Sequence, residues 1–252
     1  MIAQQKGATM RIHVINLDRS PDRLADFQRR NAHLLDVVRF PAIDARTLDR
    51  EQLIRDGSLA RDCPYKGGFL GSAMSHISLW KKAAEEDRTI TVVEDDVVVS
   101  RHFVERSQAY LASLPTDWDF VQWGWNFDAF LWVDVIPRII RAQIVFDQDQ
   151  LRQNIYDFQN ADTIPAPVRL LHSFGIHSYS VTPQGARALL SQCLPLDARL
   201  IDFPGFGVRI NNNSLDCVMN GAYPSLKAFV CMPPLVVAEN NEEASINRAP
   251  AA

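Results

Sequence analysis

The chain has 252 residues, 47% of them apolar and 22% charged, which is the composition of a globular protein large enough for one large α/β domain or two small ones. Its net charge of −4 argues against nucleic acid as the main partner. Its four cysteines have no CxxC spacing, which excludes the common zinc motifs and favours free, mostly buried thiols in a reducing compartment.

Membrane and export signals are absent from the sequence pattern. No apolar stretch has the length needed to span a bilayer, and residues 1–9 lack the apolar core of a signal peptide. We therefore expect a cytoplasmic enzyme without a transmembrane segment. Peripheral association with the inner face of a membrane stays open.

Strands and helices follow one another along most of the chain. In chain order the predicted elements are a strand at 11–17, a helix from Pro21, a strand at 37–42, a short helix at 50–55, a helix at 71–86, a strand at 89–96, a helix at 101–114, strands at 119–124 and 174–181, a helix from Thr182, and a strand at 226–230. Residues 195–213 are rich in Gly, Pro and Asn and are predicted to be irregular.

The turn after the first strand carries two arginines. Ser20 can cap the following helix, and Pro21 fits its first turn, where no amide donor is needed. Arg19 and Arg23 beside this turn could bind a phosphate through their forked guanidinium groups. They could equally be ordinary surface arginines.

The run at 89–96 ends in three consecutive acids. Its β-branched residues favour a buried strand of a parallel sheet, and ligands of such sheets bind beyond the carboxyl ends of the strands. If the pleat continues, Glu94 and Asp96 share a face while Asp95 points the other way. Two carboxylates on one face suit a metal-bound diphosphate, although a solvated acidic loop would have the same sequence.

The segment at 125–167 is long and rich in aromatic residues. Its aromatic side chains could line a sugar site or pack in the core. Its length predicts an insertion or an acceptor-side lid within a single domain at 1–238. Residues 239–252 are polar and are expected to be a disordered tail.

Five segments, in order, resemble one family, the bacterial family-25 glycosyltransferases of lipopolysaccharide and lipooligosaccharide synthesis, which are related to collagen galactosyltransferases. The similar segments are Val14–Arg23, Gly71–Trp80, Val93–Val97, Ser178–Ala186 and Pro233–Val236. Ser72 stands where the family often has cysteine, and Phe69 where it often has glutamate.

The resemblance implies a GT-A-like α/β fold for a nucleotide sugar, with a mostly parallel central sheet. It implies a divalent ion, usually Mn²⁺, that holds the diphosphate of a UDP-sugar, and a saccharide or glycolipid acceptor. Asp96 is the first choice for the metal ligand, and Glu94 is the second. The residues expected near the nucleotide are Ile15, Asn16, Asp18, Arg19, His76, Glu94 and Asp95. Without the resemblance, a single helical histidine such as His76 is more often structural.

A transferase of this kind needs a base for the acceptor hydroxyl, and a carboxylate is the natural choice in an inverting reaction. The preferred base is Asp216, which aligns with the family's late P-x-D element. Asp197 is the competitor because Pro195-Leu196-Asp197 matches that element better locally. Either aspartate could instead cap a helix.

Two other functions use the same residues. A metal-dependent phosphoester hydrolase could be built on the acids at 94–96, but the sequence lacks a second clear cluster of His and Asp ligands. A non-catalytic module that binds a glycan or a protein partner could retain the fold. Galactose as the transferred sugar is implied by the family alone.

Overall fold

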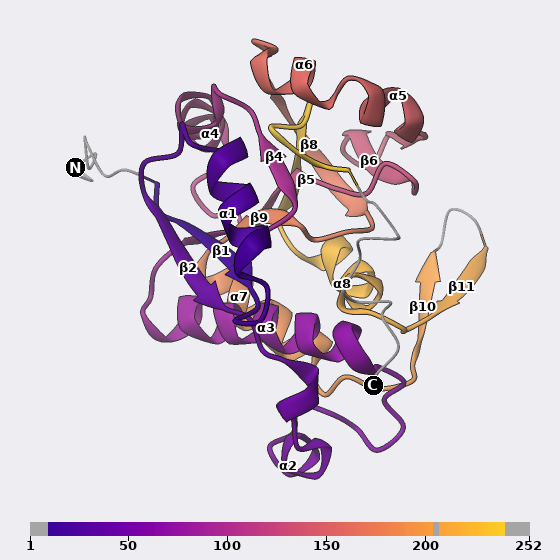
Figure 1. Cartoon of the computed structure of the whole chain (residues 1–252). Coiled ribbons are helices and arrows are strands. Elements are labelled where there is room, and N and C mark those ends of the chain that lie inside the picture. The colour runs from indigo at the N-terminus through magenta and orange to yellow at the C-terminus, as the bar shows by residue number, and fades with distance from the viewer. Residues whose placement is uncertain (1–9, 204–206, 240–252) are drawn as a thin grey trace.

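A computed structural model describes residues 10–203 and 207–239. The predicted tail at 239–252 lies, apart from Glu239, outside the described residues. A nine-stranded sheet forms the centre of the molecule (Figure 1). Its strands, in spatial order, are β2 (Val37–Pro41), β1 (Ile12–Asn16), β3 (Ile90–Glu94), β9 (Ser178–Val181), β5 (Phe120–Gly124), β12 (Ala228–Met232), β8 (Ala166–His172), β6 (Leu131–Ile136) and β7 (Ile140–Ile144).

The sheet is mixed in direction. β2, β1 and β3 are parallel, as are β5 and β12, while β9 is antiparallel to both β3 and β5. β8 is antiparallel to β12 and β6, and β7 is antiparallel to β6. Six of the nine strands therefore point the same way, and the predicted α/β class is confirmed. Most strands thus share one direction. Because β9, β8 and β7 are reversed, however, antiparallel pairs of neighbouring strands outnumber parallel pairs.

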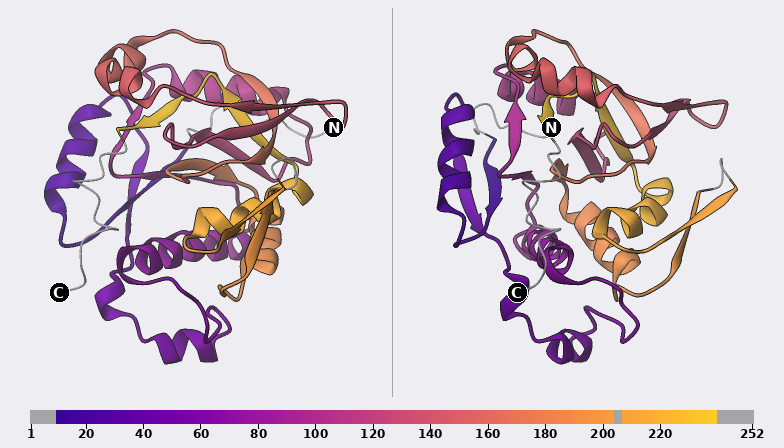
Figure 2. Two further views of the ribbon diagram at one scale, coloured as in Figure 1. Left: turned by 90° about the vertical axis from the view of Figure 1, so that its right-hand side faces the viewer. Right: turned by 45° about the vertical axis from the view of Figure 1, so that its right-hand side comes forward.

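Helices cover both faces of the sheet (Figure 2). The helices are α1 (Pro21–Arg30), α2 (Arg50–Arg55), α3 (Gly67–Glu85), α4 (Phe103–Ser113), α5 (Gln148–Gln153), α6 (Ile155–Asn160), α7 (Pro183–Cys193) and α8 (Leu215–Ala222), with 3₁₀ turns at Ala45–Thr47 and Tyr223–Ser225. Core residues of α3, α7 and α8 pack together on one face of the sheet, and those of α1 and α4 pack on the other. No helix of the described ranges is long and apolar enough to cross a membrane.

The alternation of β3 distributes its side chains between these two layers. Val92 packs in the core with α3 and α7, whereas Val93 packs in the core with α1 and α4. The next residue, Glu94, returns to the side of α3, and Asp95 follows on the side of α1. The strand therefore ends with one acid aimed at each helical layer.

Two regions form strands and helices that were not predicted from the sequence. The segment at 125–167, expected to be an insertion or lid, contributes β6 and β7 to the far edge of the main sheet and forms α5 and α6. Residues 195–213, expected to be irregular, contain a two-stranded hairpin of β10 (Leu200–Phe203) and β11 (Val208–Asn211). A further pair, β4 (Val97–Val99) with β13 (Val236–Ala238), lies beyond the acidic turn.

The helix starts depend on local chemistry. Thr182 caps α7 by accepting a hydrogen bond from the amide of Gly185 at 3.0 Å, and Pro183 occupies the first turn, as predicted. Pro21 opens α1 in the same way. The capping prediction for Ser20 is wrong, because its side chain makes no capping hydrogen bond.

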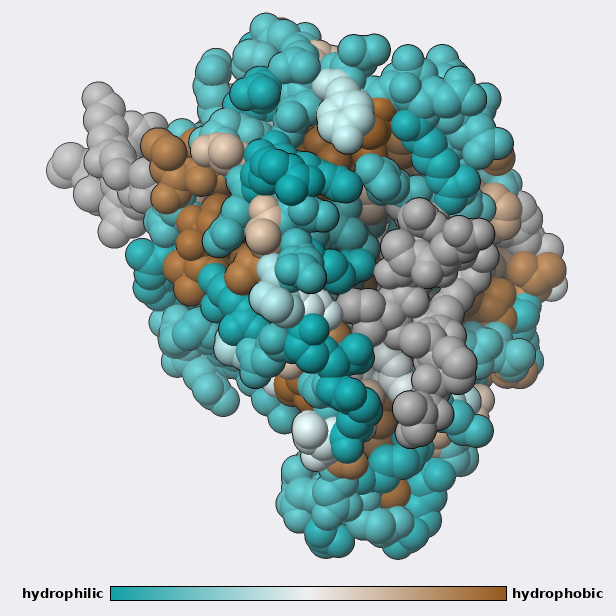
Figure 3. Space-filling model, viewed as in Figure 1, coloured by the Kyte–Doolittle hydropathy of each residue, from teal (hydrophilic) through white to brown (hydrophobic). Residues whose placement is uncertain are grey.

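The edge strand β2 borders solvent. Apolar residues gather on the left of the face shown in Figure 3, the side on which Figure 1 has β2. Val38 of β2 is 40% exposed. β2 ends at Pro41, and a proline suits an edge strand because it lacks the amide that a further neighbour would require.

Gly124 lets β13 approach the end of β5. A Cβ atom at this position would lie 2.2 Å from the backbone oxygen of Val236. We expect Gly124→Ala to lower the free energy of unfolding by about 2 kcal/mol or more, because backbone cannot move aside cheaply. Gly221→Ala in α8 is the matched control. Its new Cβ would have its nearest contact at 3.9 Å, so it should raise stability by about 0.5–1 kcal/mol in urea denaturation. Equal effects of the two substitutions would contradict this packing.

Candidate active site

The acids at the end of β3 lie beside the carboxyl end of β1. The two strands are parallel with Ile15 opposite Glu94, so both strands end at the same edge of the sheet. Asn16, the last residue of β1, donates a hydrogen bond to Oδ2 of Asp95 at 2.7 Å. Ile15 is a buried core residue of β1. Ile15 and Asn16, which the resemblance places near the nucleotide, thus lie at the same sheet edge as the three acids.

Asp95 turns to the layer of α1 and is held there. Arg23 donates hydrogen bonds from Nε, at 2.9 Å, and from Nη2 to Oδ1 of Asp95. Only 8% of the Asp95 side chain is exposed. Asn16 donates to the second oxygen of Asp95. Both carboxylate oxygens therefore have partners, and the side chain of Asp95 links β1 to α1. Arg23, one of the two arginines considered as phosphate ligands, thus pairs with carboxylates.

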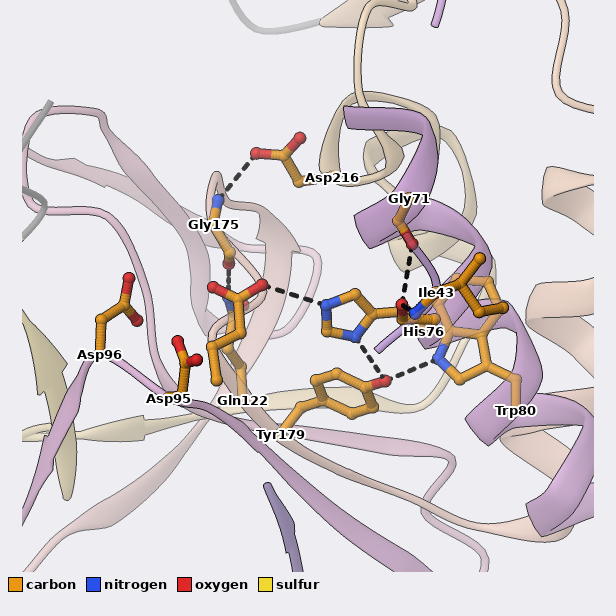
Figure 4. A network of polar contacts seen from close by, with 12 residues as sticks. Ile43, Gly71, His76, Trp80, Asp95, Asp96, Gln122, Gly175, Tyr179 and Asp216 are labelled. Atoms are coloured by element: carbon orange, nitrogen blue, oxygen red, sulfur yellow. Dashed lines mark hydrogen bonds and ion pairs between the residues drawn. The ribbon is translucent and has the colours of Figure 1, made fainter. Parts of the chain in front are cut away.

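Glu94 turns to the layer of α3, where His76 lies fully buried. Nε2 of His76 is 3.2 Å from Oε1 of Glu94, and Nδ1 of His76 is 3.0 Å from the hydroxyl of Tyr179. The indole of Trp80 donates to the same hydroxyl at 3.0 Å. Figure 4 shows this chain of contacts running from α3 across β9 to the acidic end of β3.

The direction of these hydrogen bonds follows from their donors. The indole N–H of Trp80 can only donate a hydrogen bond, so the hydroxyl oxygen of Tyr179 is the acceptor in that contact. The hydroxyl hydrogen of Tyr179 is then available to donate to Nδ1 of His76. Burial raises the pKa of Tyr179, so the hydroxyl keeps that proton. With Nδ1 as the acceptor of the Tyr179 hydroxyl, Nε2 of His76 carries the N–H that donates a hydrogen bond to Glu94. Burial acts to raise the pKa of Glu94, but the hydrogen bond from His76 opposes it and the pKa is lowered. Glu94 is therefore held as an oriented carboxylate.

Removing the Tyr179 hydroxyl tests this chain. Tyr179→Phe leaves the Trp80 N–H and Nδ1 of His76 unpaired in the core, which should cost about 2 kcal/mol or more of stability. Tyr156→Phe, at a 69% exposed position, is the control and should change stability by less than about 0.5 kcal/mol. Side-chain ¹⁵N NMR of the unmodified chain should show the proton of His76 on Nε2. A neutral imidazole with its proton on Nδ1 would contradict the assigned direction.

Asp96 is the exposed acid of the three. Its side chain is 47% exposed, and Nη2 of Arg23 lies 3.2 Å from its Oδ2. Desolvation by the surrounding protein, followed by repulsion from Glu94, raises the pKa of Asp96 to about 6 in spite of that exposure. Glu94, Asp95 and Asp96 lie here with one guanidinium group, that of Arg23, so the carboxylates outnumber the cation at this point of the site.

The remaining residues predicted near the nucleotide point elsewhere. The carboxylate of Asp18 is 81% exposed and pairs with Arg39, which also donates to Asn16. Arg19 pairs with Asp44 at 3.0 Å. Both residues lie at the loop after β1, but their charged groups contact these partners rather than the acids at 94–96.

The two aspartates considered as the base have different surroundings. Oδ2 of Asp216 accepts a hydrogen bond from the amide of Gly175 at 2.9 Å, while Oδ1 accepts from Ser214 and from the amide of Cys217. The carbonyl of Gly175 in turn accepts from Gln122 of β5. These contacts tie Asp216 to the strands beside Tyr179, in the region drawn in Figure 4.

Asp197 belongs to a separate loop after α7. Its Oδ1 accepts hydrogen bonds from the backbone amide and Nε of Arg199, and that guanidinium also binds the carbonyls of Gln192 and Pro195. Burial acts to raise the pKa of Asp197, but Arg199 outweighs it and lowers that pKa. A carboxylate neutralised in this way is a weaker base than one without a cation.

Sequence reasoning missed Tyr179 and Trp80. Trp80 could be seen to lie one turn from His76, but nothing in the sequence indicated that Tyr179, a residue of a distant strand, would join them. The alternation of the strand at 174–181 predicted only that some of its residues are buried.

His177 and His172 are buried beside this region. Burial lowers the pKa of each to about 4, below the 6.5 of an exposed histidine. The unfolded chain therefore binds more protons between these values, and stability should fall as the pH is lowered from about 6.5 toward 4. From pH 7 to pH 5 we expect a loss of about 2 kcal/mol per histidine in urea denaturation. His177→Gln should make the fall in stability between pH 7 and pH 5 shallower. An unchanged slope would contradict the lowered pKa of His177.

Comparisons with known proteins agree with the resemblance. The sequence model of the family described as "Glycosyltransferase family 25 (LPS biosynthesis protein)" matches residues 9–201. A procollagen lysyl hydroxylase and glycosyltransferase of Acanthamoeba polyphaga mimivirus is 33% identical over 132 residues, which are 44% of this chain and 14% of that protein. A glycosyltransferase 25 family member of Aedes aegypti is 29% identical over 136 residues, which are 49% of this chain and 22% of that protein. The matches thus span less than a quarter of either relative.

Solved structures give weaker likenesses. A197 from STIV has a TM-score of 0.39 and 10% identity, with 91% of this chain and 83% of that chain covered. A glycosyltransferase involved in the glycosylation of the major capsid of PBCV-1 has a TM-score of 0.36 and 8% identity, with 95% and 98% covered.

Proposed function

We propose that this chain, which belongs to glycosyltransferase family 25, transfers a sugar from a UDP-sugar to a saccharide or glycolipid acceptor with the help of a divalent ion. The observation that carries the proposal is the acidic end of β3. It presents a half-exposed carboxylate, Asp96, next to an oriented one, Glu94, at the edge where the parallel strands end. Galactose as the sugar and a surface glycan as the product remain the expectation drawn from the family.

The residues at this edge fit a divalent ion such as Mn²⁺. The described ranges contain no group of three or more His, Cys, Asp or Glu residues placed to hold a metal ion. Ions bound together with substrate phosphates need only one or two protein carboxylates. Asp96 and Glu94 would supply these, since Asp95 is occupied by Arg23 and Asn16. Desolvation is the largest cause of the raised pKa of Asp96, and the second, repulsion from Glu94, is the one that such an ion would offset.

The chemistry divides between the ion and the chain. The bound ion would offset the negative charge of the departing diphosphate. His76 keeps Glu94 ionised and aimed, and it is itself fixed by Tyr179. Asp216 would take the proton of the acceptor hydroxyl as that oxygen bonds to the anomeric carbon and the bond to the diphosphate breaks. Oδ2 of Asp216 would accept this proton. Among the described residues only the amide of Gly175 donates to that oxygen, so its second lone pair is available.

We propose that the protein works in a reducing compartment, as expected from its sequence. All four cysteines are free thiols, and Cys63, Cys193 and Cys231 are buried, as predicted. Free buried thiols suit a cytoplasmic enzyme.

A metal-removal assay tests the function. The chain, treated with EDTA, would be incubated with a panel of UDP-sugars and saccharide acceptors, before and after Mn²⁺ is restored. We expect transfer only after Mn²⁺ is restored. Phosphoester turnover without any acceptor would support the hydrolase instead. UDP-sugar binding with neither transfer nor hydrolysis across the panel would support the binding module.

A further inference from the structure

The tip of the β6–β7 hairpin, Val135–Arg141, exposes a compact set of aliphatic side chains. The exposed fractions are 53% for Val135, 44% for Ile136, 77% for Ile139 and 48% for Ile140. β6 and β7 form the last two strands of the main sheet, and the hairpin that joins them projects from the body (Figure 2). Exposed apolar residues that are adjacent in space, unlike single ones, mark an interaction surface.

The backbone of the tip is held in place. The amide of Ile139 donates to the carbonyl of Ile136 at 2.8 Å, which closes the turn around Pro137 and Arg138. The amide of Arg138 donates to the buried carboxylate of Asp134 at 3.0 Å. The register of β6 shifts between Asp134 and Ile136, and such a bulge redirects side chains. The aliphatic groups are thus presented by a fixed turn.

An arginine occupies the position of this turn where glycine is favoured. Arg138 has φ of +66°, the left-handed region that is unfavourable for a side chain. Arg141 is 64% exposed on the neighbouring strand, and its Nε lies 3.9 Å from Oδ1 of Asp134, the acid of the hairpin, which is 8% exposed. The surface of the tip therefore combines aliphatic groups with positive charge on a chain whose net charge is −4.

We propose that the tip Val135–Arg141 docks the protein on an anionic membrane surface. Aliphatic side chains would enter the boundary between headgroups and acyl chains. Arg138 would bind a lipid phosphate directly, and the terminal nitrogens of Arg141, whose Nε faces Asp134, would add a second contact. A second copy of the chain could instead pair with β7, the edge strand. Arg141 within β7 opposes such pairing, because charged side chains on an edge strand disfavour further strands. The proposal is independent of the sugar-transfer reaction.

Vesicle flotation tests the docking. The full chain would be mixed with phosphatidylcholine vesicles with and without phosphatidylglycerol, at low and high salt. We expect binding to the anionic vesicles, weakened by salt. Arg138→Gln and Arg141→Gln should each lower the partition about fivefold, and Ile139→Ser should lower it about tenfold. Leu35→Ser, at a 92% exposed residue outside the tip, is the control and should leave the partition unchanged.

Three outcomes would overturn the proposal. Equal binding to neutral and anionic vesicles, or binding unaffected by the three tip substitutions, would exclude the charged tip as the anchor. Concentration-dependent dimers in size-exclusion chromatography that disappear in Ile139→Ser, without vesicle binding, would assign the tip to a second copy. Circular dichroism and thermal unfolding of each variant separate loss of binding from loss of fold.

Discussion

Asp96→Asn is expected to lower the affinity for UDP in the presence of Mn²⁺ by at least about 100-fold, since even groups that only orient metal ligands contribute 10–100-fold. The reason is the position of Asp96, half exposed and next to Glu94, where the acids outnumber the cation Arg23. Without Mn²⁺ the substitution should not weaken UDP binding, because it removes a negative charge that repels the diphosphate. Isothermal titration of UDP with and without Mn²⁺ measures both values.

The controls separate the site from general effects of charge. Asp26→Asn in α1 removes another surface carboxylate, which pairs with Arg29, and should leave UDP affinity unchanged. Glu94→Gln should resemble Asp96→Asn. If Asp96→Asn binds UDP and Mn²⁺ as the unmodified chain does, Asp96 is not a ligand of the ion.

The second large effect is expected at Asp216. Asp216→Asn keeps the size of the side chain but removes the proton acceptor, so kcat should fall by about 10²–10⁴ while the KM for the donor changes little. The variant should still bind UDP with Mn²⁺, because Asp216 lies on α8, apart from the acids of β3. Initial-rate kinetics over both substrates measures the split between kcat and KM.

Asp197→Asn provides the comparison. This carboxylate is held by Arg199, so its replacement should reduce stability by about 1 kcal/mol and leave kcat within a few-fold. A larger loss of kcat in Asp197→Asn than in Asp216→Asn would reverse the assignment of the base.

Much of the site could be predicted because it is local in sequence. The pleat of a strand sends consecutive side chains to opposite layers, and the structure has Glu94 beside α3 and Asp95 beside α1. The pleat stops there, because β3 ends at Glu94, and Asp96 contacts Arg23 as Asp95 does. The parallel pairing of β1 with β3 brings Asn16 to the same edge. These relations need only the period of a strand and the rule that parallel strands end together.

The rest depends on contacts between distant parts of the chain. Tyr179 meets His76 across 103 residues of sequence, and no periodicity indicates which buried tyrosine will face which histidine. Arg19 and Arg23 looked alike beside the same turn, yet one pairs with Asp44 and the other with Asp95. The order of strands was equally unreadable, since β8, β6 and β7 join the sheet beyond β12, the last strand of the chain in that sheet.

Asp96 and Glu94 are expected to hold a divalent ion that binds the donor diphosphate. A crystal of the chain grown with UDP and Mn²⁺, measured near the manganese absorption edge, tests it directly. We predict one anomalous peak within bonding distance of an oxygen of Asp96 and of the diphosphate, with Glu94 as a further ligand. UDP bound at this edge without an anomalous peak, or a peak that contacts neither carboxylate, would contradict the account.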